Sequence, residues 1–143
     1  MWAKRYYSSG TVFIISSIKK NRRCVMRDSL GEIKIFDILT EAGIPFAEEY
    51  TFPDLVSSSG RFLRFDFCIF DDLGNIDFLI EYQGAQHYKA VGKFGGYKGV
   101  RRQQYNDAKK REYCLKHGLK LITIPYWDEN KITYDYIMSL AGY

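Results

Sequence analysis

Hydrophobic and polar residues alternate along two neighbouring stretches in the middle of the chain, residues 62–70 and 76–83. This alternation predicts β-strands, in which successive side chains point to opposite faces. On the first strand, the residues expected to share one face are Leu63, Phe65, Phe67 and Ile69. Those expected on its other face are Arg64, Asp66 and Cys68. The short connection at 71–75 predicts an antiparallel hairpin, and Glu81 and Gln83 share one face of the second strand.

A helix is predicted over residues 30–42. Ser29 and Glu32 have the spacing of a capping box, in which each side chain satisfies a free backbone N–H at the helix start. Gly43 follows the last apolar position, where glycine commonly ends a helix. The apolar residues that recur at near-helical spacing are Ile33, Phe36, Leu39 and Ala42.

The remaining elements are predicted from shorter signals. We expect a helix over 103–117, a strand over 119–125 and a final helix over 132–140. Residues 45–51 read as a short extended segment, 53–60 as a loop, and 84–102 as a long loop with five glycines. Residues 12–18 fit either a strand or a short helix.

This order of elements predicts an α/β fold of the α+β type, a central mixed β-sheet flanked by helices. At 143 residues, the chain is expected to form one domain. We divide it into a basic N-terminal extension at 1–27, a core at 28–126 and a C-terminal helix at 127–143.

Composition and charge narrow the function classes. The formal charge is +4, and one basic cluster lies between Lys19 and Arg27. The three cysteines have no zinc-site spacing, and no apolar run approaches the ~20 residues of a membrane span. We therefore expect a cytoplasmic protein that needs no membrane, in a bacterium or in a phage-infected host.

Candidate chemistry is concentrated on the predicted hairpin. If the register is suitable, Asp66, Glu81 and Gln83 converge at its polar end. Two nearby carboxylates repel each other, and a divalent cation removes that repulsion. Mg²⁺ takes hard oxygen ligands, including carboxylates and phosphate oxygens, and it supports phosphodiester hydrolysis. We expect Mg²⁺ as the cofactor, with Mn²⁺ as the alternative.

At these residues the sequence resembles the PD-(D/E)xK nuclease superfamily, in the variant with Gln at the usual Lys position. Within it, the chain is similar to the group of very-short-patch repair endonucleases and phage homing endonucleases, over roughly residues 29–126. The matching motifs are Ser29-x-x-Glu32, Leu63-Arg64-Phe65-Asp66-Phe67, the run Ile80 to Tyr88, Asn106-Asp107-x-x-Lys110, Tyr113-Cys114 and Leu121-Ile122-x-Ile124-Pro125-Tyr126.

The resemblance implies a restriction-endonuclease-like core and assigns roles to individual residues. Asp66 would be the central metal ligand, and Glu81 the second ligand or a close neighbour of the metal. Gln83 replaces a lysine that positions water and stabilises charge. Because Gln is neutral, either another cation substitutes, with Lys110 as our candidate, or activity is weak.

Four residues have both a functional and a structural interpretation. His87 is a candidate general base or a structural hydrogen-bonding residue. Glu32 is a capping residue that, in the family, also reaches the metal site. Asp107 and Lys110 share a helix face, either as an ion pair or over the metal site.

Basic residues suggest DNA as the partner, with RNA as the alternative. The candidates for nucleic-acid binding are Lys93, Lys98, Arg101, Arg102, Lys109 and Arg111. The predicted function is a metal-dependent DNA endonuclease of homing or repair type, acting as a monomer or homodimer. Two alternatives stay open: a weakly active or inactive nucleic-acid-binding module on the same fold, and a phage protein-interaction factor.

Overall fold

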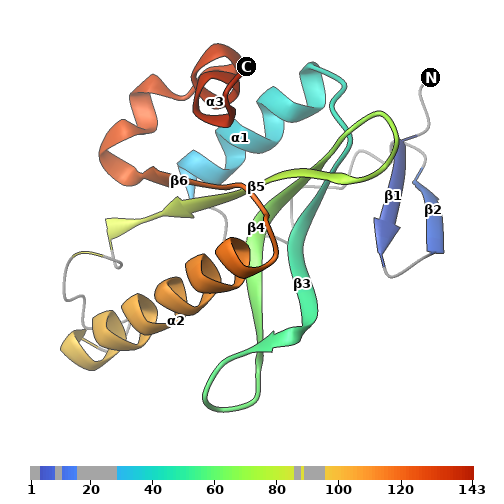
Figure 1. Cartoon of the computed structure of the whole chain (residues 1–143). Coiled ribbons are helices and arrows are strands. Elements are labelled where there is room, and N and C mark those ends of the chain that lie inside the picture. Colours follow the sequence, from blue (N-terminus) through green and yellow to red (C-terminus); the bar gives the residue numbers. More distant parts are fainter. Residues whose placement is uncertain (1–3, 9–10, 16–28, 86–87, 89–95) are drawn as a thin grey trace.

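The computed structural model describes residues 4–8, 11–15, 29–85, 88 and 96–143 (Figure 1). Its centre is a four-stranded sheet in the order β3-β4-β5-β6. These strands are β3 (Phe46–Val56), β4 (Phe62–Phe70), β5 (Ile76–Gln83) and β6 (Leu121–Pro125). β3, β4 and β5 pair antiparallel through short connections, whereas β6 pairs parallel with β5 after a helical crossover. The mixed sheet with flanking helices confirms the predicted fold class.

Helices cover both faces of this sheet. α1 (Leu30–Glu41) and α3 (Tyr134–Ala141) pack on one face, and α2 (Gly96–Lys116) packs on the other (Figure 1). The core on the α1 side includes Ile35, Phe67 and Ile80, and the core on the α2 side includes Cys68 and Cys114. The face of the hairpin that carries the acidic residues is therefore covered by α2.

The predicted facing of β4 is wrong in its first half. Phe67 and Ile69 belong to the α1-side core as expected, but Leu63 and Phe65 belong to the α2-side core. The alternation therefore changes phase between Phe65 and Phe67. On the neighbouring strand β3, Glu49 lies opposite this point with a φ of 50°, a left-handed conformation that strand residues rarely adopt. Asp66 lies at this change of phase.

The start of α1 is as predicted. Ser29 and Glu32 form both hydrogen bonds of the capping box, and Ala42 and Gly43 end the helix. Gly31 has a packing role that the sequence did not indicate. A Cβ atom at this position would lie 2.1 Å from Cε2 of Tyr82 on β5. Glycine therefore allows α1 to approach the strand that carries the acidic residues.

Several predicted boundaries are wrong. β3 continues to Val56 through Pro53, which an edge strand tolerates because its outer N–H groups need no partner. α2 begins at Gly96 rather than residue 103, despite the glycines in its first turns. A 3₁₀ helix, η4 (Tyr126–Lys131), precedes α3, which begins at Tyr134.

The described part of the N-terminal region is a small hairpin. β1 (Lys4–Ser8) and β2 (Thr11–Ile15) pair antiparallel, so the described part of the ambiguous stretch 12–18 is a strand. The basic cluster from Lys19 to Arg27 lies outside the described residues, as do His87 and Lys93. In the part of the chain that the structure describes, no helix is long and apolar enough to cross a membrane.

Candidate active site

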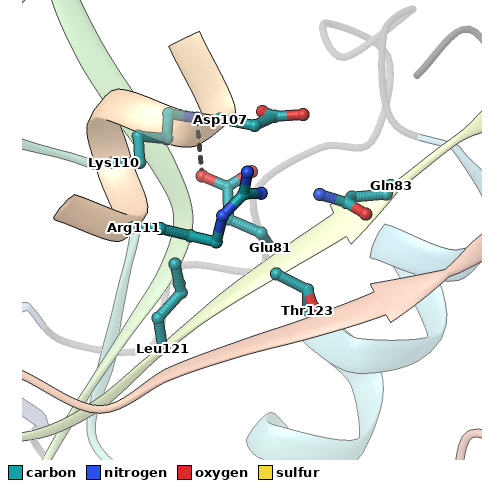
Figure 2. Close-up of a pocket in the computed structure, with 7 residues that line it drawn as sticks. All are labelled: Glu81, Gln83, Asp107, Lys110, Arg111, Leu121 and Thr123. Carbon is teal, nitrogen blue, oxygen red and sulfur yellow. Dashed lines mark hydrogen bonds and ion pairs between the residues drawn. The ribbon is translucent and has the colours of Figure 1, made fainter. Parts of the chain in front are cut away.

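A small pocket opens between α2 and the neighbouring strands β5 and β6 (Figure 2). Its lining residues are Glu81, Gln83, Asp107, Lys110, Arg111, Leu121 and Thr123. The strands bring Glu81 beside Thr123 and Gln83 beside Pro125 through their parallel pairing. α2 contributes the charged residues from above the sheet. The pocket thus combines two strands and a helix that are distant in sequence.

Glu81 is the only charged residue among the buried side chains of the described part, with 5% of its surface exposed. The ammonium of Lys110 donates to its Oε1 at 2.6 Å (Figure 2). Burial, followed by the negative charge of Asp66, raises the pKa of Glu81 to about 8, and Lys110 only partly opposes this shift. A second acidic residue, Asp107, adds to the rise.

Asp66 lies next to the last paired residue between β4 and β5. The pairing of the two strands ends with Phe67 opposite Ile80. Beyond this pair, Oδ2 of Asp66 accepts a hydrogen bond from the backbone N–H of Tyr82 at 2.7 Å. The carboxylate of Asp66 is thus held against β5, close enough for its charge to act on Glu81.

Asp107 and Lys110 both line the pocket from one face of α2, as their spacing predicts. Lys110 is nevertheless paired with Glu81, and its ammonium also lies 5.5 Å from the ring centre of Phe65. The side chain of Lys110 is 12% exposed, so little water screens its interaction with Glu81. Lys110 therefore places a positive charge inside the pocket, next to the position where the resemblance expects a lysine.

Gln83 is fixed by a residue that the sequence analysis did not select. The hydroxyl of Tyr88 donates to Oε1 of Gln83. The Tyr88 ring packs against Trp127 and Tyr126 of η4, with ring centres 4.7 and 6.0 Å away. No sequence spacing signals this contact, because it depends on where η4 places its aromatic rings after β6.

Glu32 lies elsewhere. Its carboxylate accepts from the backbone N–H of Ser29, and its charge acts on Tyr82, which faces the α1 side of the sheet. The Tyr82 hydroxyl donates to Glu129 at 3.1 Å. Burial, then these carboxylates, raise the pKa of Tyr82 to about 12. Glu32 is not among the residues that line the pocket.

The basic candidates on α2 divide into three groups. Lys98, Arg101 and Arg102 are exposed near the start of the helix. Lys109 is instead tied to the edge strand, since its ammonium donates to the carbonyl of Val56 at 2.7 Å. Arg111 lines the pocket, closer to the acidic residues than its assignment to a nucleic-acid surface implied.

Thr123 is a further pocket residue that sequence reasoning missed. Its position could have been found from the parallel register of β5 and β6, which pairs it with Glu81. That register is long-range information, because α2 separates the two strands.

The described residues offer few side-chain ligands for a metal ion. Among the described residues, no group of three or more His, Cys, Asp and Glu side chains is arranged to hold one. Asp66 and Glu81 form a pair of carboxylates that act on each other electrostatically. Mg²⁺ is commonly held by only one or two carboxylates, with waters and substrate phosphate oxygens completing its coordination. The pair fits such a site.

Comparison with known proteins identifies two viral relatives that match part of the chain. No family model and no solved structure matches the chain. Uncharacterized protein 094L of Frog virus 3 (isolate Goorha) is 51% identical over 49 residues, which cover 33% of this chain and 32% of that protein. Uncharacterized protein 307L of Invertebrate iridescent virus 6 is 43% identical over 58 residues, covering 40% and 29% respectively. The chain thus spans about a third of the length of the curated relatives it matches.

Proposed function

We propose that the chain is a metal-dependent DNA endonuclease that hydrolyses phosphodiester bonds on a restriction-endonuclease-like core. The buried carboxyl of Glu81, held beside Asp66 and Lys110, carries this proposal. A buried acid among other acids is unfavourable for folding, and such groups with a shifted pKa are frequent at functional sites.

Asp66 and Glu81 would hold Mg²⁺ or Mn²⁺. When bound, the ion would lower the pKa of a ligating water and neutralise charge on the phosphoryl group. Its positive charge would also counteract the raised pKa of Glu81 and keep this carboxylate ionised near neutral pH. A divalent cation would therefore relieve the repulsion between Asp66 and Glu81 in the metal-free site.

The chain's own residues would supply the remaining functions. Lys110 and Arg111 bring positive charge to the pocket, where they would bind the phosphate of the substrate. Asp107, on the same face of α2, would accept a hydrogen bond from the attacking water. Gln83 is neutral, but Lys110 would supply the positive charge that the lysine of the resembled motif provides.

The test is incubation of supercoiled plasmid with Mg²⁺ or Mn²⁺, comparing the wild type with Asp66→Asn. The Asn oxygen can still accept from the N–H of Tyr82, so the strand contact is preserved while the charge is removed. We expect nicked or linear plasmid with the wild type and a loss of at least ~100-fold in rate with the variant. Linear product would indicate that two copies act together.

A matched control is Asp72→Asn, which removes an exposed carboxylate from the turn between β4 and β5. This variant should cleave like the wild type. Undiminished cleavage by Asp66→Asn, with the control equally active, would contradict the assignment of the site.

A second candidate is a nucleic-acid-binding module without cleavage. The contact between Lys110 and Glu81 favours it, because a buried pair of this kind can stabilise the pocket without any metal. Salt-sensitive DNA binding with no cleavage in Mg²⁺, Mn²⁺ or Co²⁺ would support this function over the first.

The expected setting is the interior of an infected cell, since both relatives are viral proteins. A nuclease there would meet DNA and Mg²⁺ together.

A further inference from the structure

The amide of Gln83 has a defined orientation. Its oxygen can only accept hydrogen bonds, and its NH₂ group can only donate them. The Tyr88 hydroxyl donates to the oxygen. The nitrogen is then the end that points into the pocket, toward Glu81 and Asp107 (Figure 2). Gln83 therefore presents a hydrogen-bond donor to the pocket.

Tyr88 is itself held by aromatic contacts. Trp127 and Tyr126 belong to η4, and their ring centres lie 5.3 Å apart in an edge-to-face arrangement. Both contact the Tyr88 ring. These ring contacts restrict where the phenol hydroxyl lies. The rings of η4 thus position the hydroxyl that donates to Oε1 of Gln83.

We propose that Tyr88 is a positioning residue, which fixes the Gln83 amide so that its NH₂ group donates to a non-bridging phosphate oxygen of the substrate. This inference rests on the proposed function and adds the role of a residue outside the pocket lining. A phosphodiester presents only acceptors at its non-bridging oxygens. With the amide reversed, Gln83 would direct an oxygen at the phosphate and repel it.

The first experiment is Tyr88→Phe, which keeps the ring and its contacts with η4 and removes only the hydroxyl. We expect kcat for plasmid nicking to fall about tenfold, a change of ~1.4 kcal/mol in the barrier, with KM changed less than about twofold. Tyr134→Phe is the control, because it removes a phenol hydroxyl from a partly exposed residue at the start of α3. It should leave both constants unchanged.

A second measurement does not depend on activity. In the ¹⁵N-labelled full chain, NMR relaxation of the Gln83 side-chain NH₂ reports how ordered the amide is. We expect an ordered amide in the wild type and in Tyr134→Phe, and a mobile one in Tyr88→Phe. Addition of a short DNA duplex in EDTA should shift the Gln83 NH₂ resonances of the wild type.

A third measurement separates positioning from packing. Lysine at position 83 has three donors and no acceptor, so it needs no partner to orient it. In the Gln83→Lys background, Tyr88→Phe should therefore have less than a twofold effect on kcat. An equal loss in both backgrounds would show that Tyr88 acts through packing and would overturn the inference.

The outcomes also separate this inference from the proposed function. If the wild type cleaves no DNA in any metal, the proposed nuclease activity is wrong. The NMR comparison still decides the role of Tyr88 in that case. An amide that stays equally ordered in Tyr88→Phe, or resonances that do not shift with the duplex, would refute the inference whatever the activity.

Discussion

At the scale of single residues, the defining feature is a carboxyl group kept in an unfavourable environment. Glu81 is buried among Asp66, Asp107 and Lys110, and its raised pKa of about 8 reflects burial more than any single neighbour. Acids in this state release a proton when a cation binds, so protonation and metal binding would compete at one side chain.

This environment predicts a pH dependence of stability in metal-free buffer. The pKa of Glu81 is higher in the folded chain than in the unfolded chain, so folding favours the protonated acid. Its contribution is full below the unfolded pKa and is lost as the pH rises toward about 8. We expect the free energy of unfolding to decrease over this window by a few kcal/mol, on the order of the shift itself.

The measurement is urea unfolding at several pH values in EDTA, for the wild type and Glu81→Gln. The variant cannot titrate at this position, so its stability should vary less with pH, and it should exceed the wild type at the alkaline end. Parallel pH profiles for the two proteins would show that Glu81 is not the titrating group.

The sequence indicated much of this site but not its full composition. Asp66, Glu81, Gln83, Asp107 and Lys110 were selected from spacing and resemblance, and the structure places all five around one pocket or against it. The contacts that fix their orientations could not be predicted. The pairing of Lys110 with Glu81 and the hydrogen bond from Tyr88 to Gln83 depend on how α2 and η4 pack on the sheet.

At the scale of elements, a glycine allows α1 to pack closely against β5. Gly31 lies in the first turn of α1, and the ring of Tyr82 occupies the space that a side chain would need. Tyr82 lies between Glu81 and Gln83 on β5. Its packing against α1 therefore supports these two pocket residues from the opposite face of the sheet.

Gly31→Ala should therefore destabilise the chain. Alanine normally stabilises a helix by roughly 0.5–1 kcal/mol relative to glycine. Here the added Cβ would overlap the Tyr82 ring, and overpacking of this kind typically costs about 1–3 kcal/mol. Thermal and urea unfolding would measure the change.

Two controls identify the cause. Thr40→Ala, at an exposed position of the same helix, should change stability by less than ~0.5 kcal/mol. In a Tyr82→Ala background, Gly31→Ala should become neutral or stabilising, because the ring is gone. A stabilising effect in the wild-type background would mean that the close contact is absent in solution.

The bounds of a helix or strand were predictable where a single local sequence pattern determined them. The capping box of α1 and the alternation of β4 and β5 are local, and their bounds agree with the structure to within one residue. The change of face between Phe65 and Phe67 on β4 was not predictable. It coincides with the left-handed conformation of Glu49 on β3, which no local pattern indicates. The true start of α2 was hidden by Gly96 and Gly99, which are unusual in a helix.

At the scale of the whole molecule, exposed positive charge lies near the start of α2, on the helix that also lines the pocket. Arg101 and Arg102 are exposed there, while Arg111 and Lys110 reach the pocket further along. A single helix therefore connects a candidate DNA-contacting surface to the candidate catalytic residues.

This arrangement predicts how DNA binding responds to salt. Each phosphate contact contributes about −0.9 to the slope of log K against log salt concentration for duplex DNA. The double variant Arg101→Ala/Arg102→Ala should reduce the magnitude of that slope by about 2. Fluorescence anisotropy with a labelled duplex in EDTA would measure it.

The control is Lys131→Ala, which removes an exposed charge from η4 that pairs with Asp128. Its slope should match that of the wild type. A similar reduction in the control would show that DNA contacts positive charge without preference for α2.

The parallel pairing of β5 with β6 also has a consequence for folding order. β3, β4 and β5 form a meander of short connections, whereas β6 joins only after the chain has passed through α2. Closing the longer connection costs more chain entropy, so the meander can form before the pocket exists. Glu81 then remains in water, ionised and unhindered, until α2 docks. We therefore expect Glu81 to become buried in one of the last steps of folding, when α2 and β6 complete the sheet.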